Sequence, residues 1–307
     1  MLVKKLLFKL KNIMLKKLLF VFLILVNFQC LATTIDFVFD NSPGAPVDIY
    51  YRRLIEHIEA KSSFKFNIVY KPGASSNIAY TYINSTKKPV VFVAQPKFLT
   101  NKTFASDGYP IGIADSVNPI FYLGESVLIL EVNARSNLYK LQDLIDLSKR
   151  RPIRFGFGGG TGTNSYSAMK KMCDTLLADC ISINFKSGSE GMSAVLNDTT
   201  DIYPMTATGG ESIVNNPYYR SILLLSTRSA NHFNISKPIP SMPNNLSYLN
   251  DNNRWFMFLS KNLLQSDQVE LTKVLKSEET YLSSQFGMHY VYKDPAVVWS
   301  QILLQNK

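Results

Sequence analysis

The 307-residue sequence contains few of the residues from which catalytic and metal centres are built. It has only three cysteines and three histidines. His57, His232 and His289 lie far apart in the chain, and no group of residues has the spacing of a zinc site. The glycine-rich stretches contain neither G-x-x-x-x-G-K-[ST] nor G-x-G-x-x-G, and Gly188–Gly191 is not a G-x-S-x-G elbow. We therefore expect no metal, no cofactor and no enzymatic activity.

Positive charge is concentrated at the N-terminus. Residues 1–32 contain six lysines, no acidic residue and the apolar run Leu18–Val26. This run is too short to span a bilayer, but it has the length of a signal-peptide core. We predict a signal peptide over residues 1–32, cleaved after Ala32, and export to the periplasm. An uncleaved anchor is the alternative, and Met1 and Met14 are both candidate starts.

Without residues 1–32 the chain has 27 basic and 23 acidic residues, a net charge of +4. So small an excess over some 275 residues does not indicate a nucleic-acid partner. We expect a monomer that does not bind nucleic acid.

Cys173 and Cys180 are the two cysteines that remain after processing. An oxidising compartment favours a disulfide between them. A continuous helix would hold their Cα atoms about 10 Å apart, so pairing requires the helix to end near Ala178. Two buried free thiols are the alternative.

Short apolar runs alternate with amphipathic segments along the mature chain, which indicates an α/β fold with a mostly parallel sheet. The predicted strands are 35–39, 66–70, 90–94, 126–132, 153–157, 181–185, 202–206, 222–226 and 255–259. The predicted helices are 47–59, 77–83, 138–149, 164–177, 191–196, 266–284 and 294–304. The Pro-, Asn- and Ser-rich stretch 228–253 is predicted to be a long surface connection.

The stretch Phe155–Asn164 contains four glycines in five residues, between a predicted strand and a predicted helix. Glycines let the backbone turn sharply, and the N-terminus of a helix offers free N–H groups and a positive dipole end. We expect this loop to bind an anion, most simply a carboxylate. A second turn, Ser42–Asp48, also follows a strand and precedes a helix. Both loops are therefore at the end of the sheet where ligands bind.

Four sequence motifs resemble, in the same order, those of the Bug-type substrate-binding proteins of tripartite tricarboxylate transporters. They are Pro43–Arg52, Lys71–Ile78, Leu141–Gly162, in which Pro152 matches the proline of the family motif, and Phe185–Asp201. The chain departs from the family pattern at several positions: Asn41, Ala45, Ser75, Ser76, Tyr166, Ser187 and Asp198.

The resemblance implies a periplasmic-binding-protein-like, type II-like flytrap, with two α/β lobes joined by crossing hinge strands. One lobe would comprise residues 33–130 and 227–307, and the other residues 131–226. The ligand would be a small carboxylic acid held by backbone amides and hydroxyls, and a membrane permease of the tripartite type or a sensor would receive it. The candidate ligand-binding residues are Ser42, Gly44, Ala45, Asp48, Gly159, Gly160, Thr161, Gly162, Thr163, Tyr166, Ser189 and Asp201.

Several of these residues have plainer interpretations. Asp48 can cap the first helix and pair with Arg52, Tyr166 can be a core tyrosine, and Asp201 can belong to a turn. The predicted function is a periplasmic receptor that captures a small carboxylate and delivers it to a transporter. The alternative is an exported interaction or sensor protein that kept the fold but lost transport. An exported hydrolase would need an unrecognised nucleophile such as Ser189.

Overall fold

The computed structural model describes residues 33–94, 116–249 except 162 and 209, 253–289 except 286, and 294, 296–298 and 300. The predicted signal peptide and most of the predicted helix 294–304 lie outside these residues. Within the described part of the chain, no helix combines the length and apolar character needed to cross a membrane.

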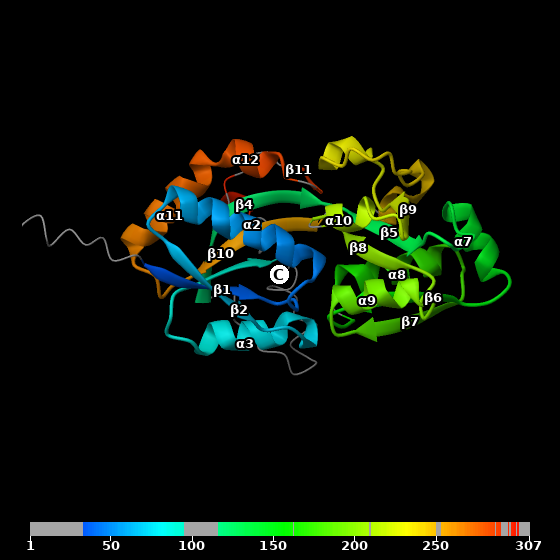
Figure 1. Ribbon diagram of the computed structural model, residues 1–307, viewed down its shortest axis with the longest axis horizontal. Helices are drawn as coiled ribbons and strands as arrows, with labels where there is room; N and C mark the ends of the chain where they lie inside the picture. The colour runs from blue at the N-terminus through cyan, green and yellow to red at the C-terminus, as the bar shows by residue number, and fades with distance from the viewer. Residues whose placement is uncertain are drawn as a thin grey trace, which may run out of the picture. The chain divides into compact units, whose positions relative to one another are not determined.

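The first sheet has six strands in the order β11-β4-β10-β3-β1-β2 (Figure 1). Its strands are β1 (Thr34–Phe39), β2 (Lys65–Tyr70), β3 (Val90–Ala94), β4 (Val117–Ser126), β10 (Asn253–Ser260) and β11 (Met288–His289). Strand β1 runs parallel to β2 and β3, whereas β10 is antiparallel to β3 and β4, and β11 is antiparallel to β4.

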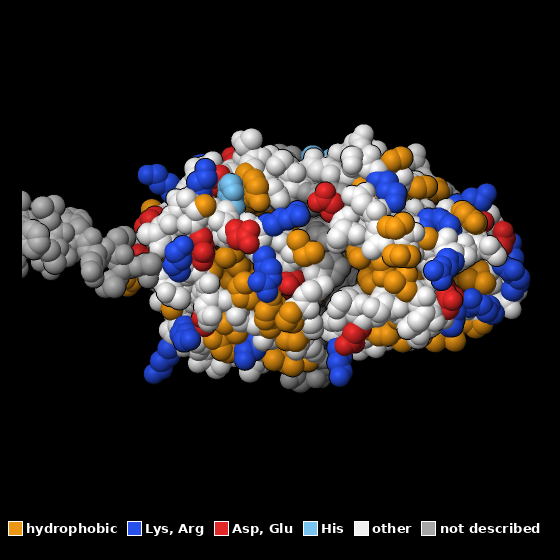
Figure 2. Space-filling model, in the orientation of Figure 1, with side chains coloured by type: hydrophobic (Ala, Val, Ile, Leu, Met, Phe, Trp, Pro, Cys, Tyr) orange, Lys and Arg blue, Asp and Glu red, His pale blue; other side chains and the backbone are white. Residues whose placement is uncertain are grey.

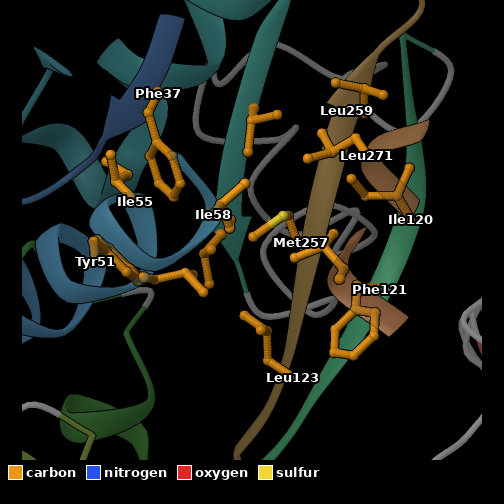
Figure 3. Close-up of a cluster of buried hydrophobic side chains, with 14 of the residues drawn as sticks. Phe37, Tyr51, Ile55, Ile58, Ile120, Phe121, Leu123, Met257, Leu259 and Leu271 are labelled. Atoms are coloured by element: carbon orange, nitrogen blue, oxygen red, sulfur yellow. The ribbon is translucent and has the colours of Figure 1, made fainter. Parts of the chain in front are cut away.

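Helices cover both faces of this sheet. On one face lie α2 (Pro46–Lys61), α11 (Gln265–Ser277) and α12 (Glu279–Ser283), and on the other lies α3 (Asn77–Ser85). Alternate strand residues point to opposite faces of the sheet. Phe37 packs against Tyr51 of α2 (Figure 3). Val38, the next residue, belongs to the cluster under α3. This double coverage explains why strands such as β3 are continuous apolar runs.

A second group of strands is arranged as β8-β5-β9 and β6-β7. It comprises β5 (Leu128–Asn133), β6 (Ile153–Gly158), β7 (Cys180–Phe185), β8 (Tyr203–Thr206) and β9 (Tyr219–Leu224). A parallel bridge from Phe155 to Ile202 joins β6 to the start of β8. Helices α7 (Leu141–Ser148) and α8 (Asn164–Thr175) pack on one face, and α9 (Gly188–Leu196) packs on the other. The short α10 (Glu211–Val214) follows β8.

The two sheets are joined by crossing strands, as predicted. Strand β4 ends at Ser126 and β5 begins at Leu128, so only Val127 separates a strand of the first sheet from a strand of the second. The chain returns to the first sheet through β10. The exact lobe boundaries of the sequence analysis stay a prediction.

The sheets are mixed, which differs from the predicted mostly parallel arrangement. Among the described residues, parallel pairing joins β1 to β2 and β3, joins β6 to β7, and occurs in the two bridges Phe155–Ile202 and Leu224–Ser241. The crossing strands account for the difference, because β5 pairs antiparallel with both β8 and β9.

The predicted surface connection 228–253 is also corrected. It contains two 3₁₀ helices, Ala230–Phe233 and Asn244–Leu249, and contributes buried side chains to the core. Phe233 and Ile235 are fully buried in the cluster that includes α9 and β8. The stretch therefore runs over the surface but anchors several side chains in the core of the second sheet.

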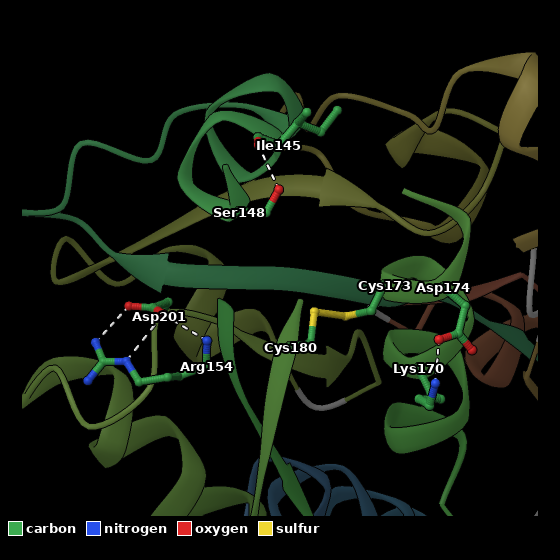
Figure 4. The surroundings of a disulfide bond; sticks show 8 residues. All are labelled: Ile145, Ser148, Arg154, Lys170, Cys173, Asp174, Cys180 and Asp201. Atoms are coloured by element: carbon green, nitrogen blue, oxygen red, sulfur yellow. Dashed lines mark hydrogen bonds and ion pairs between the residues drawn. A yellow bond between two sulfur atoms is a disulfide. The ribbon is translucent and has the colours of Figure 1, made fainter. Parts of the chain in front are cut away.

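Cys173 and Cys180 form a disulfide whose Cα atoms are 6.3 Å apart (Figure 4). Helix α8 ends at Thr175, and Leu177 takes a left-handed conformation, so the chain turns back before β7 starts at Cys180. The early end of the helix supplies the geometry that pairing was expected to require.

Candidate functional site

A cavity of about 160 Å³ lies where the carboxyl ends of β1 and β6 meet the N-termini of α2, α8 and α9. Its lining includes Asp40 and Asn41 after β1, Gly158 and Gly159 after β6, and Thr206 at the end of β8. The space corresponds to roughly five water molecules, enough for a small organic acid. The position agrees with the rule that ligands bind beyond the carboxyl ends of strands.

The second glycine-rich loop forms one part of the cavity wall. Gly159 and Gly160 have φ values of 84° and 103°, which L side chains rarely adopt. The Gly159 N–H donates to Phe185 O (3.2 Å), and the Gly160 N–H donates to Asn184 Oδ1 (3.2 Å), both on β7. These bonds fix the loop on the neighbouring strand, and they also use two of the amides that were expected to bind the ligand.

The N-terminus of α8 supplies the remaining polar groups of this loop. Thr163 is the N-cap residue, and its Oγ1 accepts from the Tyr166 N–H (3.4 Å). Thr163 and Ser165 both line the cavity. Because amides in the first helical turn have no acceptor within the helix, this end presents donors and a partial positive charge.

Helix α9 begins at the same cavity. Ser187 is its N-cap, with Oγ accepting from the Glu190 N–H (3.3 Å), and Lys186, Ser187 and Gly188 line the wall. A Cβ at Gly158 would stand 3.2 Å from Gly188 N, so glycine there permits the close approach of β6 to this helix. Two helices of twelve and nine residues thus start at one cavity.

The first loop is arranged differently from the prediction. The Gly44 N–H donates to Asp48 Oδ2 (2.9 Å), and the Ala45 N–H donates to Ser42 O (3.1 Å). Asp48 is buried, and its carboxylate also accepts from Arg52 Nε and from the Tyr70 hydroxyl. The Asp48 carboxylate therefore accepts an amide that was expected to bind a ligand anion. Its hydrogen bond to Gly44 and its pairing with Arg52 agree with the structural role that was the alternative for Asp48.

The predicted site residues divide into three groups. Ala45, Gly159 and Thr163 line the cavity. Ser42, Gly44, Gly160 and Thr161 are described in the same two loops but are not part of its lining, and Gly162 lies outside the described residues. Asp48, Tyr166, Ser189 and Asp201 also lie outside the lining.

Asp201 has a structural environment. Its carboxylate accepts a hydrogen bond of 2.7 Å from the Arg154 guanidinium and one of 2.8 Å from the Arg154 N–H (Figure 4). It also accepts two hydrogen bonds of 2.7 Å from the Arg151 guanidinium. Burial alone would raise the pKa of Asp201, but the bonds from Arg151 and Arg154 outweigh it and lower the pKa to about 2. Arg154 is near the start of β6, whereas the cavity is at its end, so Asp201 stabilises the lobe away from the ligand.

Tyr166 and Ser189 also have structural partners. The ring of Tyr166 packs 4.8 Å from that of Phe157 and borders the cluster under α8. Ser189 Oγ lies 3.0 Å from Ser187 Oγ. The core interpretation of Tyr166 is therefore the one that its contacts support.

The cavity contains residues that the sequence analysis did not single out as ligand-binding. Asp40, Ser76, Lys186 and Trp255 all line it, and Lys186 is exposed at its edge. Trp255 Nε1 is shielded from solvent and has no hydrogen-bond acceptor among the described residues. Since buried polar groups are normally paired, the indole N–H is a candidate donor to a ligand.

Charged side chains outside the cavity are dispersed. Figure 2 shows Lys and Arg interspersed with Asp and Glu over the face in view, without a single basic patch on that face.

No family model and no curated protein matches the sequence. Solved structures match its fold. The periplasmic binding protein BugD aligns with a TM-score of 0.75 at 15% identity, covering 89% of this chain and 95% of that one. MatC from Rhodopseudomonas palustris with bound malate aligns with a TM-score of 0.70 at 12% identity, covering 89% and 97%. R. palustris Rpa4515 with adipate aligns with a TM-score of 0.72 at 12% identity, covering 89% and 94%. The chain therefore has the two-lobed α/β fold of periplasmic binding proteins, including Bug-type receptors, which confirms the predicted fold class.

Proposed function

We propose that the protein is an exported periplasmic receptor that captures a small carboxylic acid in the cavity between its two sheets and delivers it to a membrane transporter. The observation that carries this proposal is the meeting of two helix N-termini, α8 and α9, at one cavity. Helix N-termini favour anions because they combine free N–H donors with a positive dipole end.

Side chains in the wall support the same ligand class. Trp255 offers an indole N–H, Lys186 a positive charge, and Thr163 and Ser187 stand at the caps of the two helices. The fold relatives MatC and Rpa4515 hold malate and adipate, which are both carboxylates. In the first loop the Gly44 N–H already donates to Asp48, so we place the ligand carboxylate at the starts of α8 and α9 instead.

The strength of such a site follows from its donors. A hydrogen bond to a charged group contributes about 1.5–3 kcal/mol. Three or four of them, after the cost of ordering the ligand, support binding near −8 kcal/mol, or a Kd on the order of micromolar.

The experiment is a thermal-shift screen of the chain without residues 1–32, using a panel of mono-, di- and tricarboxylates. Sugars, polyamines and neutral amides at equal concentration serve as the comparison classes. We expect one or more carboxylates to raise the Tm, because a ligand that binds only the folded state stabilises it by mass action.

A shift with another class and none with carboxylates would contradict the proposal. If no small molecule binds but a stable protein partner is captured, the alternative of an interaction or sensor protein would replace it.

A further inference from the structure

Among the described residues that line the cavity, Asp40 is the one acidic residue. It follows the last residue of β1, Phe39. Its Oδ2 accepts from Ser76 Oγ (2.6 Å) and its Oδ1 accepts from Asn41 Nδ2 (2.7 Å). Both donors also line the cavity, so a hydrogen-bonded carboxyl cluster forms one part of its wall.

In the part of the chain that the structure describes, no cationic side chain pairs with the cluster. None of the ion pairs among the described residues involves Asp40, and its ionisable neighbours are the phenols of Tyr51 and Tyr80. Burial raises the pKa of Asp40, although the bonds from Ser76 and Asn41 act in the opposite direction. Asp40 is partly buried and borders the cavity, where a carboxylate without a cationic partner can bind a positively charged group of a ligand.

A carboxylate can accept about four hydrogen bonds. Ser76 and Asn41 use two of these positions, which leaves acceptor capacity for a donor on the ligand. The charges elsewhere in the wall have the opposite sign, because Lys186 and the N-termini of α8 and α9 lie there. A ligand with only negative charge would meet repulsion at Asp40, whereas a ligand with both signs is complementary to the whole wall.

We propose that the ligand is an amino acid or a similar small amino-carboxylate, whose ammonium group binds Asp40 while its carboxylate binds at the starts of α8 and α9. This inference rests on the proposed function, since it names the class of acid that the same cavity takes. Asp40 is then the residue that separates amino acids from plain and hydroxy acids.

The test uses sets of three acids that differ at a single carbon, which carries hydrogen, hydroxyl or ammonium. Suitable sets are succinate, malate and aspartate; glutarate, 2-hydroxyglutarate and glutamate; propionate, lactate and alanine; and phenylpropionate, phenyllactate and phenylalanine. Calorimetric titration of the chain without residues 1–32 gives each Kd. We expect the ammonium member of the best-binding set to bind about 10- to 100-fold more tightly than its hydrogen counterpart.

Two variants assign the preference to the cluster. Asp40→Asn keeps the size of the side chain and is expected to remove most of this preference while leaving the plain acid bound as well or better. Ser76→Ala removes a donor that stabilises the charged form of Asp40, so it should reduce the preference for the ammonium member, and it serves as a second variant if the first does not fold. Asp146→Asn makes the same change of charge at an exposed position of α7, and we expect it to leave every Kd unchanged.

The outcomes separate the two proposals. Equal affinity for all members of a set, or tighter binding of the plain acid, would overturn the inference but leave the carboxylate receptor standing. An ammonium preference that survives in both Asp40→Asn and Ser76→Ala would also overturn it. Failure of every acid, amino or not, to bind would overturn both.

Discussion

Glu131, at the centre of β5, is fully buried, and its replacement by glutamine provides a quantitative test of the packing. Its Oε1 accepts from Ser221 Oγ (2.7 Å), while Oε2 has no partner among the described residues. Burial raises the pKa of Glu131 from 4.5 to about 7, against the hydrogen bond from Ser221 and the charge of Lys237, which lower it.

The sign of the effect follows from proton linkage. Because the folded state binds this proton more tightly than the unfolded state, the stability contributed by Glu131 is complete below about pH 4.5 and is lost as the pH rises through about 7. At 1.36 kcal/mol per pKa unit, the loss is about 3 kcal/mol at pH 8. Glutamine has nearly the same shape and carries no proton that titrates in this range.

We therefore expect the free energy of unfolding of Glu131→Gln, minus that of the parent, to increase by about 3 kcal/mol between pH 4 and pH 8. Any pH-independent cost of the substitution cancels in this change. Urea unfolding followed by circular dichroism at several pH values measures this difference. Glu56→Gln, the same change at an exposed position of α2, serves as the control for the substitution itself. A constant difference for Glu131→Gln would refute the reasoning.

Three further changes test other parts of the structure. Trp255→Phe removes the unpaired indole N–H and should weaken binding of the best acid about 10-fold in calorimetry, while an unchanged Kd would exclude Trp255 as a donor. Replacing Cys173 and Cys180 together by serine should lower the free energy of unfolding by about 2.5 kcal/mol, as expected for an eight-residue loop, and a parent that is insensitive to reductant would contradict this. Asp201→Asn should cost about 1–2 kcal/mol at pH 7, a loss that shrinks as the pH falls towards 2, because the low pKa of Asp201 is a property of the folded state. The same variant should keep the ligand affinity of the parent, and a large loss of affinity would return Asp201 to the site.

The elements that have a simple sequence pattern, such as a continuous apolar run, were predicted from the sequence. Strand Val90–Ala94 is a buried apolar run, and it was predicted with the bounds that the structure gives. Strand β4 was missed before Ser126 because Pro119 and Gly124 resemble turn residues. In the structure both lie beside register shifts in the pairing with β10, where β-bulges tolerate such residues.

The connection 228–253 was misjudged for a related reason. Its many Pro, Asn and Ser residues indicate a loop, but they do not reveal that Phe233 and Ile235 are buried against the second sheet. Burial of this kind depends on tertiary contacts, so the local spacing of apolar residues does not predict it.

The parts of the candidate site that lie within one loop were predictable from the sequence. The parts that combine residues from segments far apart in the chain were not. The glycine-rich loop was identified from its composition and its place between a strand and a helix. Asp40, Ser76 and Trp255 come from three separate parts of the chain, and only the folded arrangement brings them to one cavity. The arrangement of the first loop was not predictable, because the sequence does not show that the Asp48 side chain turns back to accept the Gly44 N–H.

The most direct measurement is a crystal structure of the chain without residues 1–32 bound to the acid that gives its largest thermal shift. Our account predicts a ligand carboxylate oxygen about 2.7–3.2 Å from the backbone N–H of Ser165 or Gly188, at the starts of α8 and α9. An acid held elsewhere on the protein, or held in this cavity by charged side chains alone without either amide, would contradict it.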